Sequence, residues 1–190
     1  MYVSREQSRV VKVIFHIIII LAFSKITYAQ DNAGHTGWWG NIEAGIGYVG
    51  LSIQEHKETD PHFYLGFSGG YSINPDFLIG VELSGWLFEG SNLQNPYEGD
   101  GISQVFAIIR YYPLKTKNFF TKIGGGYVSH WNNHAGMTET KEGWGLALGA
   151  GYDFAMKSYL SLTPFLTYNY GDLKDQQHSA VSFGIGVTFH

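Results

Sequence analysis

Large apolar and small or polar residues alternate with a period of two along most of the chain after residue 37. The clearest stretch is 178–190, where every second side chain from Val181 to Phe189 is large and apolar. This period is typical of an extended strand with one apolar face. The same alternation recurs seven times, and the eight predicted strands are 38–51, 63–73, 77–88, 102–112, 119–130, 142–154, 159–170 and 178–190.

The connections between these strands alternate in length. The long ones are predicted at 52–62, 89–101, 131–141 and 171–177, and the short ones at 74–76, 113–118 and 155–158. Long loops on one side and tight turns on the other are typical of antiparallel barrels in the bacterial outer membrane. The predicted fold class is therefore all-β, an eight-stranded antiparallel up-and-down transmembrane β-barrel.

A soluble, lipocalin-like cup also has eight strands, but it would turn its apolar faces inward. Here the other face carries mainly Gly, Ala, Ser, Thr and a few charges, which suits a narrow polar interior. Aromatic residues also gather at both ends of the predicted outer face, as the two interfacial girdles of a membrane barrel do. They are Tyr71, Phe77, Tyr111, Phe119, Phe154 and Phe189 at the short connections, and Tyr48, Phe63, Tyr127, Tyr168 and Tyr170 at the long ones.

Residues 1–29 have the layout of a secretory signal peptide. Basic residues precede an apolar run at 13–23, and the small residues Thr27 and Ala29 flank Tyr28 before Gln30. The run is too short for a membrane-spanning helix, which argues against the alternative of a retained anchor. We therefore predict a signal peptide at 1–29 and a barrel domain at 30–190.

The composition excludes several kinds of chemistry. The chain has no Cys, so disulfides, thiol chemistry and lipoprotein anchoring are excluded. Its formal net charge of −4 becomes −7 once the leader, with four basic residues and one acidic residue, is removed. No basic surface is left to indicate a nucleic-acid partner. Three of the four predicted long loops carry an excess of acidic residues, and the loop at 131–141 does so when the neighbouring Glu142 is counted.

Four charged residues fall on the predicted inner face: Glu43, Glu82, Arg110 and Lys122. Two acids and two bases in a narrow lumen can neutralise each other, whereas an unpaired buried charge is costly. Strands 77–88, 102–112 and 119–130 are consecutive, so we predict that Glu82 pairs with Arg110 or Lys122.

The chain resembles the small eight-stranded outer-membrane barrels, the family of the outer-membrane protein A transmembrane domain and outer-membrane protein X. The resemblance rests on Arg-Tyr-Tyr-Pro at 110–113, Lys-Ile-Gly-Gly-Gly-Tyr at 122–127, Gly-Ala-Gly-Tyr-Asp at 149–153 and the closing aromatic Phe189. Glu82, Arg110 and Lys122 are similar to the interior ion-pair set of that family. The resemblance implies that the barrel-insertion machinery recognises the terminal aromatic, although His190 follows it here.

Some barrels of this size are enzymes that act on lipid A or phospholipid. The only dense set of candidate side chains is Ser129, His130, His134 and Glu139. Ser129 and His130 are neighbours on one strand and should point to opposite faces, which argues against a nucleophile–base pair. Lipid A deacylases that resemble this size class keep Ser two residues after His, and residue 132 is Asn. We predict no catalytic, cofactor or metal site.

The sequence favours a non-enzymatic barrel with a structural or surface-interaction role through its extracellular loops. A lipid A- or phospholipid-modifying enzyme is the alternative, and a narrow channel comes third. The expected partners are outer-membrane lipids and lipopolysaccharide, the insertion machinery and a surface ligand at the loops. We expect an integral outer-membrane monomer with both termini in the periplasm.

Overall fold

A computed structural model describes residues 37–53, 56–88, 99–114, 118–134, 137–174 and 176–190. The predicted signal peptide at 1–29 and most of the predicted loop at 89–101 lie outside these ranges. The described residues contain no helix that is long and apolar enough to cross a membrane. Their strands are β1 (Gly37–Ile53), β2 (His56–Asn74), β3 (Phe77–Leu87), β4 (Gly99–Tyr111), β5 (Phe119–His134), β6 (Met137–Tyr152), β7 (Phe154–Lys157), β8 (Leu160–Leu173) and β9 (Gln176–Phe189).

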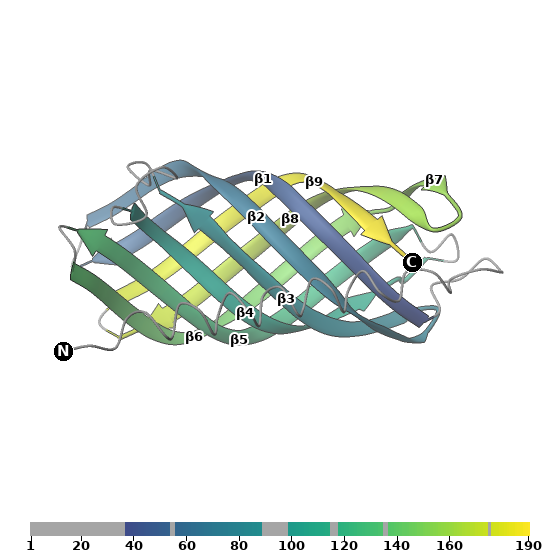
Figure 1. Cartoon of the computed structure of the whole chain (residues 1–190), viewed down its shortest axis with the longest axis horizontal. Coiled ribbons are helices and arrows are strands. Elements are labelled where there is room, and N and C mark those ends of the chain that lie inside the picture. The colour runs from purple at the N-terminus through teal and green to yellow at the C-terminus, as the bar shows by residue number, and fades with distance from the viewer. Residues whose placement is uncertain (1–36, 54–55, 89–98, 115–117, 135–136, 175) are drawn as a thin grey trace.

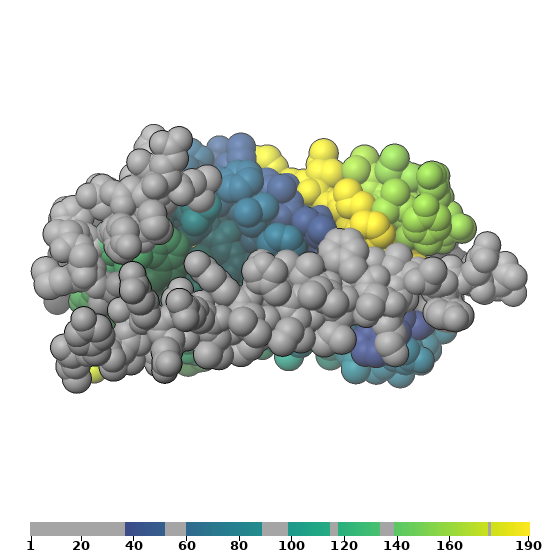
Figure 2. Space-filling view, in the orientation of Figure 1, coloured from purple at the N-terminus to yellow at the C-terminus, as the bar shows by residue number. Residues whose placement is uncertain are grey.

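These strands form one closed antiparallel sheet (Figure 1). The short β7 continues β6 after Asp153, because Gly151 pairs with Phe165 and Phe154 pairs with Leu162 on the same strand, β8. Nine assigned strands therefore make an eight-stranded barrel, as the sequence predicts. The seam joins β1 to β9, from Gly40 opposite Phe189 to Ser52 opposite Gln177. The two strands lie side by side on the surface (Figure 2).

The barrel has two different ends. We call the end with the connections around 54–55, 89–98, 135–136 and 175 the loop end. The opposite end, with the short connections, β7 and the C-terminus, is the turn end (Figure 1). There, Asn74 Oδ1 accepts hydrogen bonds from the backbone amides of Asp76 and Phe77, each at 2.9 Å, and forms the tight turn expected at 74–76.

Three predicted long loops prove to be strand extensions in part. The β1–β2 ladder continues to Ile53 opposite His56, and the β5–β6 ladder continues to His134 opposite Met137. At the last connection, Leu173 still pairs with Gln176. The predictions at 52–62, 131–141 and 171–177 were therefore too long. Apolar alternation ends where the outer surface becomes polar, but backbone pairing does not depend on an apolar side chain.

The outer surface is the more apolar one. In the described ranges, thirty large hydrophobic side chains are exposed, against sixteen hydrophobic residues in the core. We call this ring of exposed apolar side chains the apolar belt. So large an apolar surface is unfavourable in water and is stable when lipid hydrocarbon surrounds it. Aromatic side chains mark its two borders, with Tyr71, Phe77, Tyr111 and Phe154 exposed toward the turn end and Tyr48, Phe63, Tyr127 and Tyr168 toward the loop end.

Candidate functional site in the lumen and at the loop end

The four charged residues predicted on the inner face lie deep in the lumen, each at most 3% exposed. Lys122 Nζ donates a hydrogen bond to Glu82 Oε2 at 2.6 Å and lies 3.9 Å from Glu43 Oε2. Arg110 Nη2 lies 3.3 Å from Glu43 Oε1. Of the two partners considered for Glu82, Lys122 makes the contact, and Arg110 turns to Glu43. We call these four residues the interior charge cluster.

Aromatic rings hold Arg110 in place. Its guanidinium carbon lies 4.6 Å from the ring centroid of Trp39 and 4.7 Å from that of Phe120. Arg110 Nη2 also donates to Ser68 Oγ at 3.1 Å. A cation close to two aromatic rings keeps favourable contacts after it leaves water. These contacts offset part of the cost of burying Arg110, whose Nε and Nη1 are buried without a hydrogen-bond partner in the described structure.

A hydrogen-bond chain continues from the cluster toward the turn end. Asn41 Nδ2 donates to Glu43 Oε1 at 2.6 Å, and Thr163 Oγ1 donates to Asp153 Oδ1 at 2.6 Å. Thr188 Oγ1 lies between them, 3.2 Å from Asn41 Oδ1 and 2.7 Å from Thr163 Oγ1, and can donate its one proton to either oxygen. These side-chain contacts connect β1, β9, β8 and Asp153, the residue between β6 and β7. They therefore link the β1–β9 seam to the neighbouring strands of the barrel.

Asp153 is a fifth buried interior charge, only 2% exposed, that the sequence-based set of interior charges omitted. Tyr112 donates to its Oδ2 at 2.8 Å, and His190 Nε2 lies 3.8 Å from the same atom. Asp153 alternates with the outward residues of the predicted strand 142–154, as Gly149 and Gly151 do, and so falls on the same inner face. Its inward direction could therefore have been inferred from the sequence.

The middle of the lumen is filled by aromatic side chains. Tyr64 lies with its ring centroid 5.6 Å from that of Trp86 and 5.5 Å from that of Phe165. Trp86 Nε1 donates to Ser182 Oγ at 2.9 Å, and Phe106 is fully buried. Eight strands leave a lumen that side chains can fill. These residues, which we call the aromatic block, separate the interior charge cluster from the loop end.

At the loop end, His130 points into the lumen and bridges two strands. Its Nε2 lies 2.8 Å from Asp100 Oδ1 on β4, and its Nδ1 lies 3.2 Å from Gln176 Oε1 on β9. Nearby His178 is buried, and neither of its ring nitrogens has a hydrogen-bond partner among the described residues. Asp100 and Gln176 were assigned to loops by the sequence, so their place beside His130 was not foreseen.

The candidate catalytic side chains do not converge. Ser129 alternates with His130 along β5 and lies on the same face as the exposed Tyr127, whereas His130 turns inward to Asp100. Glu139 is exposed and pairs through its backbone with Asn132. His134 pairs with Met137 in the same ladder, and its side chain is outside the described part of the structure. No three His, Cys, Asp or Glu side chains of the described ranges are placed to hold a metal ion.

Comparison with known proteins identifies the fold and nothing finer. No family model matches the chain, and no curated protein sequence does. Neisserial surface protein A (NspA) is similar in structure, with 19% identity and a TM-score of 0.55 over 83% of this chain and 99% of that one. Ail, the attachment invasion locus protein of Yersinia pestis, is 17% identical with a TM-score of 0.51 over 81% and 99%. The chain thus has the fold of the small eight-stranded outer-membrane barrels.

Proposed function

We propose that this protein is a non-enzymatic barrel of the bacterial outer membrane, which presents its loop end as an interaction surface. The main support for this proposal is that the β1–β2 and β5–β6 hairpins extend beyond the apolar belt at the loop end. β5 runs seven residues beyond Tyr127 of the loop-end girdle, to His134. At roughly 3.3 Å per residue, this lifts the hairpin by up to ~23 Å along the strand direction. Rigid strands that project from the membrane are a scaffold on which loops carry recognition.

The filled lumen supports this assignment over a channel. The aromatic block occupies the middle of the barrel, and the interior charge cluster occupies the region toward the turn end. Both are tied by hydrogen bonds to opposite walls, as the contacts of Trp86 with Ser182 and of Arg110 with Glu43 show. A permeating solute would have to displace side chains that are packed and paired.

The loop-end geometry also supports a non-enzymatic role. A lipid-modifying enzyme needs a nucleophile or base that reaches the lipid-facing surface or the rim. The ordered His–Asp pair, His130 with Asp100, faces the lumen instead, and Ser129 lies on the other face of the strand. We infer that this pair orders the start of β4 against β5 and β9.

The charge of the loop end indicates what it can bind. Glu139, Glu142 and Asp172 lie there with Lys141 and Lys174, so acids are in excess. The solved complex of Ail contains a heparin analogue, sucrose octasulfate. An acidic rim would repel such a polyanion, since like charges brought together are unfavourable. We propose a cationic surface ligand, or lipopolysaccharide phosphates bridged by divalent cations.

Orientation follows from the same proposal. The loop end faces the outside of the cell, and the turn end, with both ends of the barrel sequence, faces the periplasm. The insertion machinery would then meet β9 and Phe189 at the periplasmic side.

Two measurements in cells test the role. Replacing residues 89–98 with a neutral Gly/Ser segment, which leaves Asp100 and β4 intact, should alter adhesion or phage binding while the barrel still assembles, as judged by heat-modifiable gel mobility. Mass spectrometry of lipid A from cells with and without the protein should show the same acyl chains. A change in lipid A that His130→Ala abolishes would support the enzymatic alternative and contradict our proposal.

A further inference from the structure

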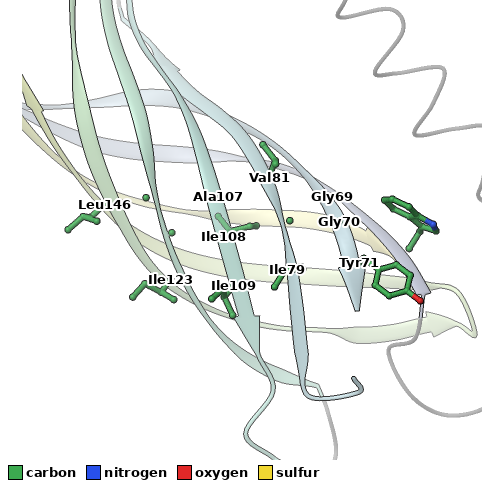
Figure 3. A pocket seen from close by; sticks show the side chains of 14 residues that line it. Gly69, Gly70, Tyr71, Ile79, Val81, Ala107, Ile108, Ile109, Ile123 and Leu146 are labelled. Carbon is green, nitrogen blue, oxygen red and sulfur yellow. The ribbon is translucent and has the colours of Figure 1, made fainter. Parts of the chain in front are cut away.

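The outer surface of the barrel is not uniformly convex. A groove of about 880 Å³ crosses the lipid-facing side of β2 to β5 (Figure 3). Gly69, Ala107 and Gly125 contribute to its floor, and Ile79, Ile109 and Ile123 rise along its turn-end border. The groove lies inside the apolar belt, and no charged side chain lines it.

Strand register explains the groove. On the outer face, Gly69 pairs with Val81, Val81 with Ala107, and Ala107 with Gly125, which makes a row of mostly small residues across four strands. The next outward row toward the turn end is bulky throughout. It consists of Tyr71, Ile79, Ile109 and Ile123. The next outward row toward the loop end, also of large residues, consists of Phe67, Leu83, Val105 and Tyr127.

We propose that this groove binds one acyl chain of a phospholipid in the turn-side leaflet, an inference that rests on the proposed membrane location and orientation. The groove is continuous with the surface that meets hydrocarbon, so acyl chains are the molecules presented to it. An unfilled groove would forfeit dispersion contacts along its floor, and a flexible chain can follow its shape.

The dimensions and position agree with this occupant. The row from Gly69 to Gly125 crosses three inter-strand spacings, roughly 14 Å at about 4.8 Å each. Because barrel strands tilt by about 35–45°, this row rises about 8–10 Å along the membrane normal, which fits within one leaflet of about 15 Å. The groove also borders Trp38 and Tyr71, which are exposed at the turn-end girdle. A chain could therefore enter from the headgroup level of that leaflet and end near the middle of the belt.

Photo-crosslinking in vesicles tests the site directly. The purified full barrel is inserted into phosphatidylethanolamine–phosphatidylglycerol vesicles that contain a phospholipid with a diazirine on one acyl chain. After irradiation, peptide mapping should show several-fold more label at Ile79, Ile109 and Ile123 than at Leu162, Leu166 and Ile185, which are exposed on β8 and β9. Equal labelling around the barrel would overturn the proposal.

A pair of variants separates the groove from the general lipid surface. Ala107→Phe fills the floor and should remove most of the enrichment, whereas Ala44→Phe adds the same ring at an outward position outside the groove and should leave it unchanged. Heat-modifiable mobility confirms that both variants fold. Crosslinked dimers that Ala107→Phe abolishes would identify a second copy as the occupant and refute the acyl chain. Failure of the barrel to enter the vesicles would instead contradict the proposed membrane location.

Discussion

Arg110 and Glu43 form a salt bridge of 3.3 Å across the lumen, although β4 and β1 are not neighbours in the sheet. Arg110 pairs with Lys122 in the β4–β5 register, so two bases are neighbours on the inner face. Glu43 approaches both cations, since its second oxygen lies 3.9 Å from Lys122. The carboxylate on β1 therefore offsets the repulsion between two adjacent bases.

Removal of one member of the Arg110–Glu43 pair should destabilise the barrel strongly. Leaving one buried charge unpaired typically costs about 3–5 kcal/mol. Arg110→Leu and Glu43→Leu should each lower the urea midpoint for unfolding from lipid vesicles, followed by tryptophan fluorescence. The double variant should recover part of the loss, and strictly additive losses would show that the two side chains are not coupled.

Lys122→Met should destabilise the barrel by a similar amount, because it leaves Glu82 without its 2.6 Å partner. A Lys at the loop-end rim supplies the control. Lys141→Met removes the same charge from a partly exposed side chain, where a surface charge is worth about 0–1 kcal/mol. Equal shifts in the urea midpoint for the two variants would contradict a dominant contribution from the interior pair.

Tyr112→Phe removes the hydroxyl that donates to Asp153 at 2.8 Å. Hydrogen bonds to charged groups contribute about 1.5–3 kcal/mol, so the free energy of unfolding should fall by that amount. Tyr111 is its neighbour on the outer face and is 40% exposed. Tyr111→Phe in the same assay should change the free energy of unfolding much less, and a larger effect at Tyr111 would count against the Asp153 contact.

The aromatic block predicts the electrical behaviour of the barrel. In planar lipid bilayers the unmodified protein should show almost no ion conductance, because Tyr64, Trp86 and Phe165 fill the lumen. Trp86→Ala removes the largest of them and the contact with Ser182, and discrete conductance steps should appear. Trp144→Ala, on the outer face, is the control. Large steps in the unmodified protein would show that the block opens readily.

The sequence predicted the facing of the interior charges but not their partners. Parity along a strand decides whether a side chain points in or out, and it placed Glu43, Glu82, Arg110 and Lys122 correctly by direction. Which carboxylate meets which base depends on barrel closure and on the stagger between strands. The alternation of apolar and polar residues does not determine closure or stagger. The sequence therefore could not show that Arg110 pairs with Glu43 and not with Glu82.

The loop end was predicted less well than the belt. Asp100, His130 and Gln176 come together because strand pairing persists beyond the apolar belt, where the hydrophobic signal has ended. Asp100 and Gln176 therefore read as loop residues in the sequence. The groove was likewise hidden, since Gly69, Ala107 and Gly125 form a row only when three registers are known together.

The contacts across the lumen constrain the order of assembly. In a flat sheet, β4 and β8 would stand three spacings apart, roughly 14 Å, yet Gln104 Nε2 donates to Asn169 Oδ1 at 3.0 Å between them. An unrolled sheet would leave these amides and the buried charges without partners, and hydrocarbon could not supply any. Water must therefore cover the inner face until the sheet curls, so that rolling up and shedding this water become a single step that coincides with entry into the membrane.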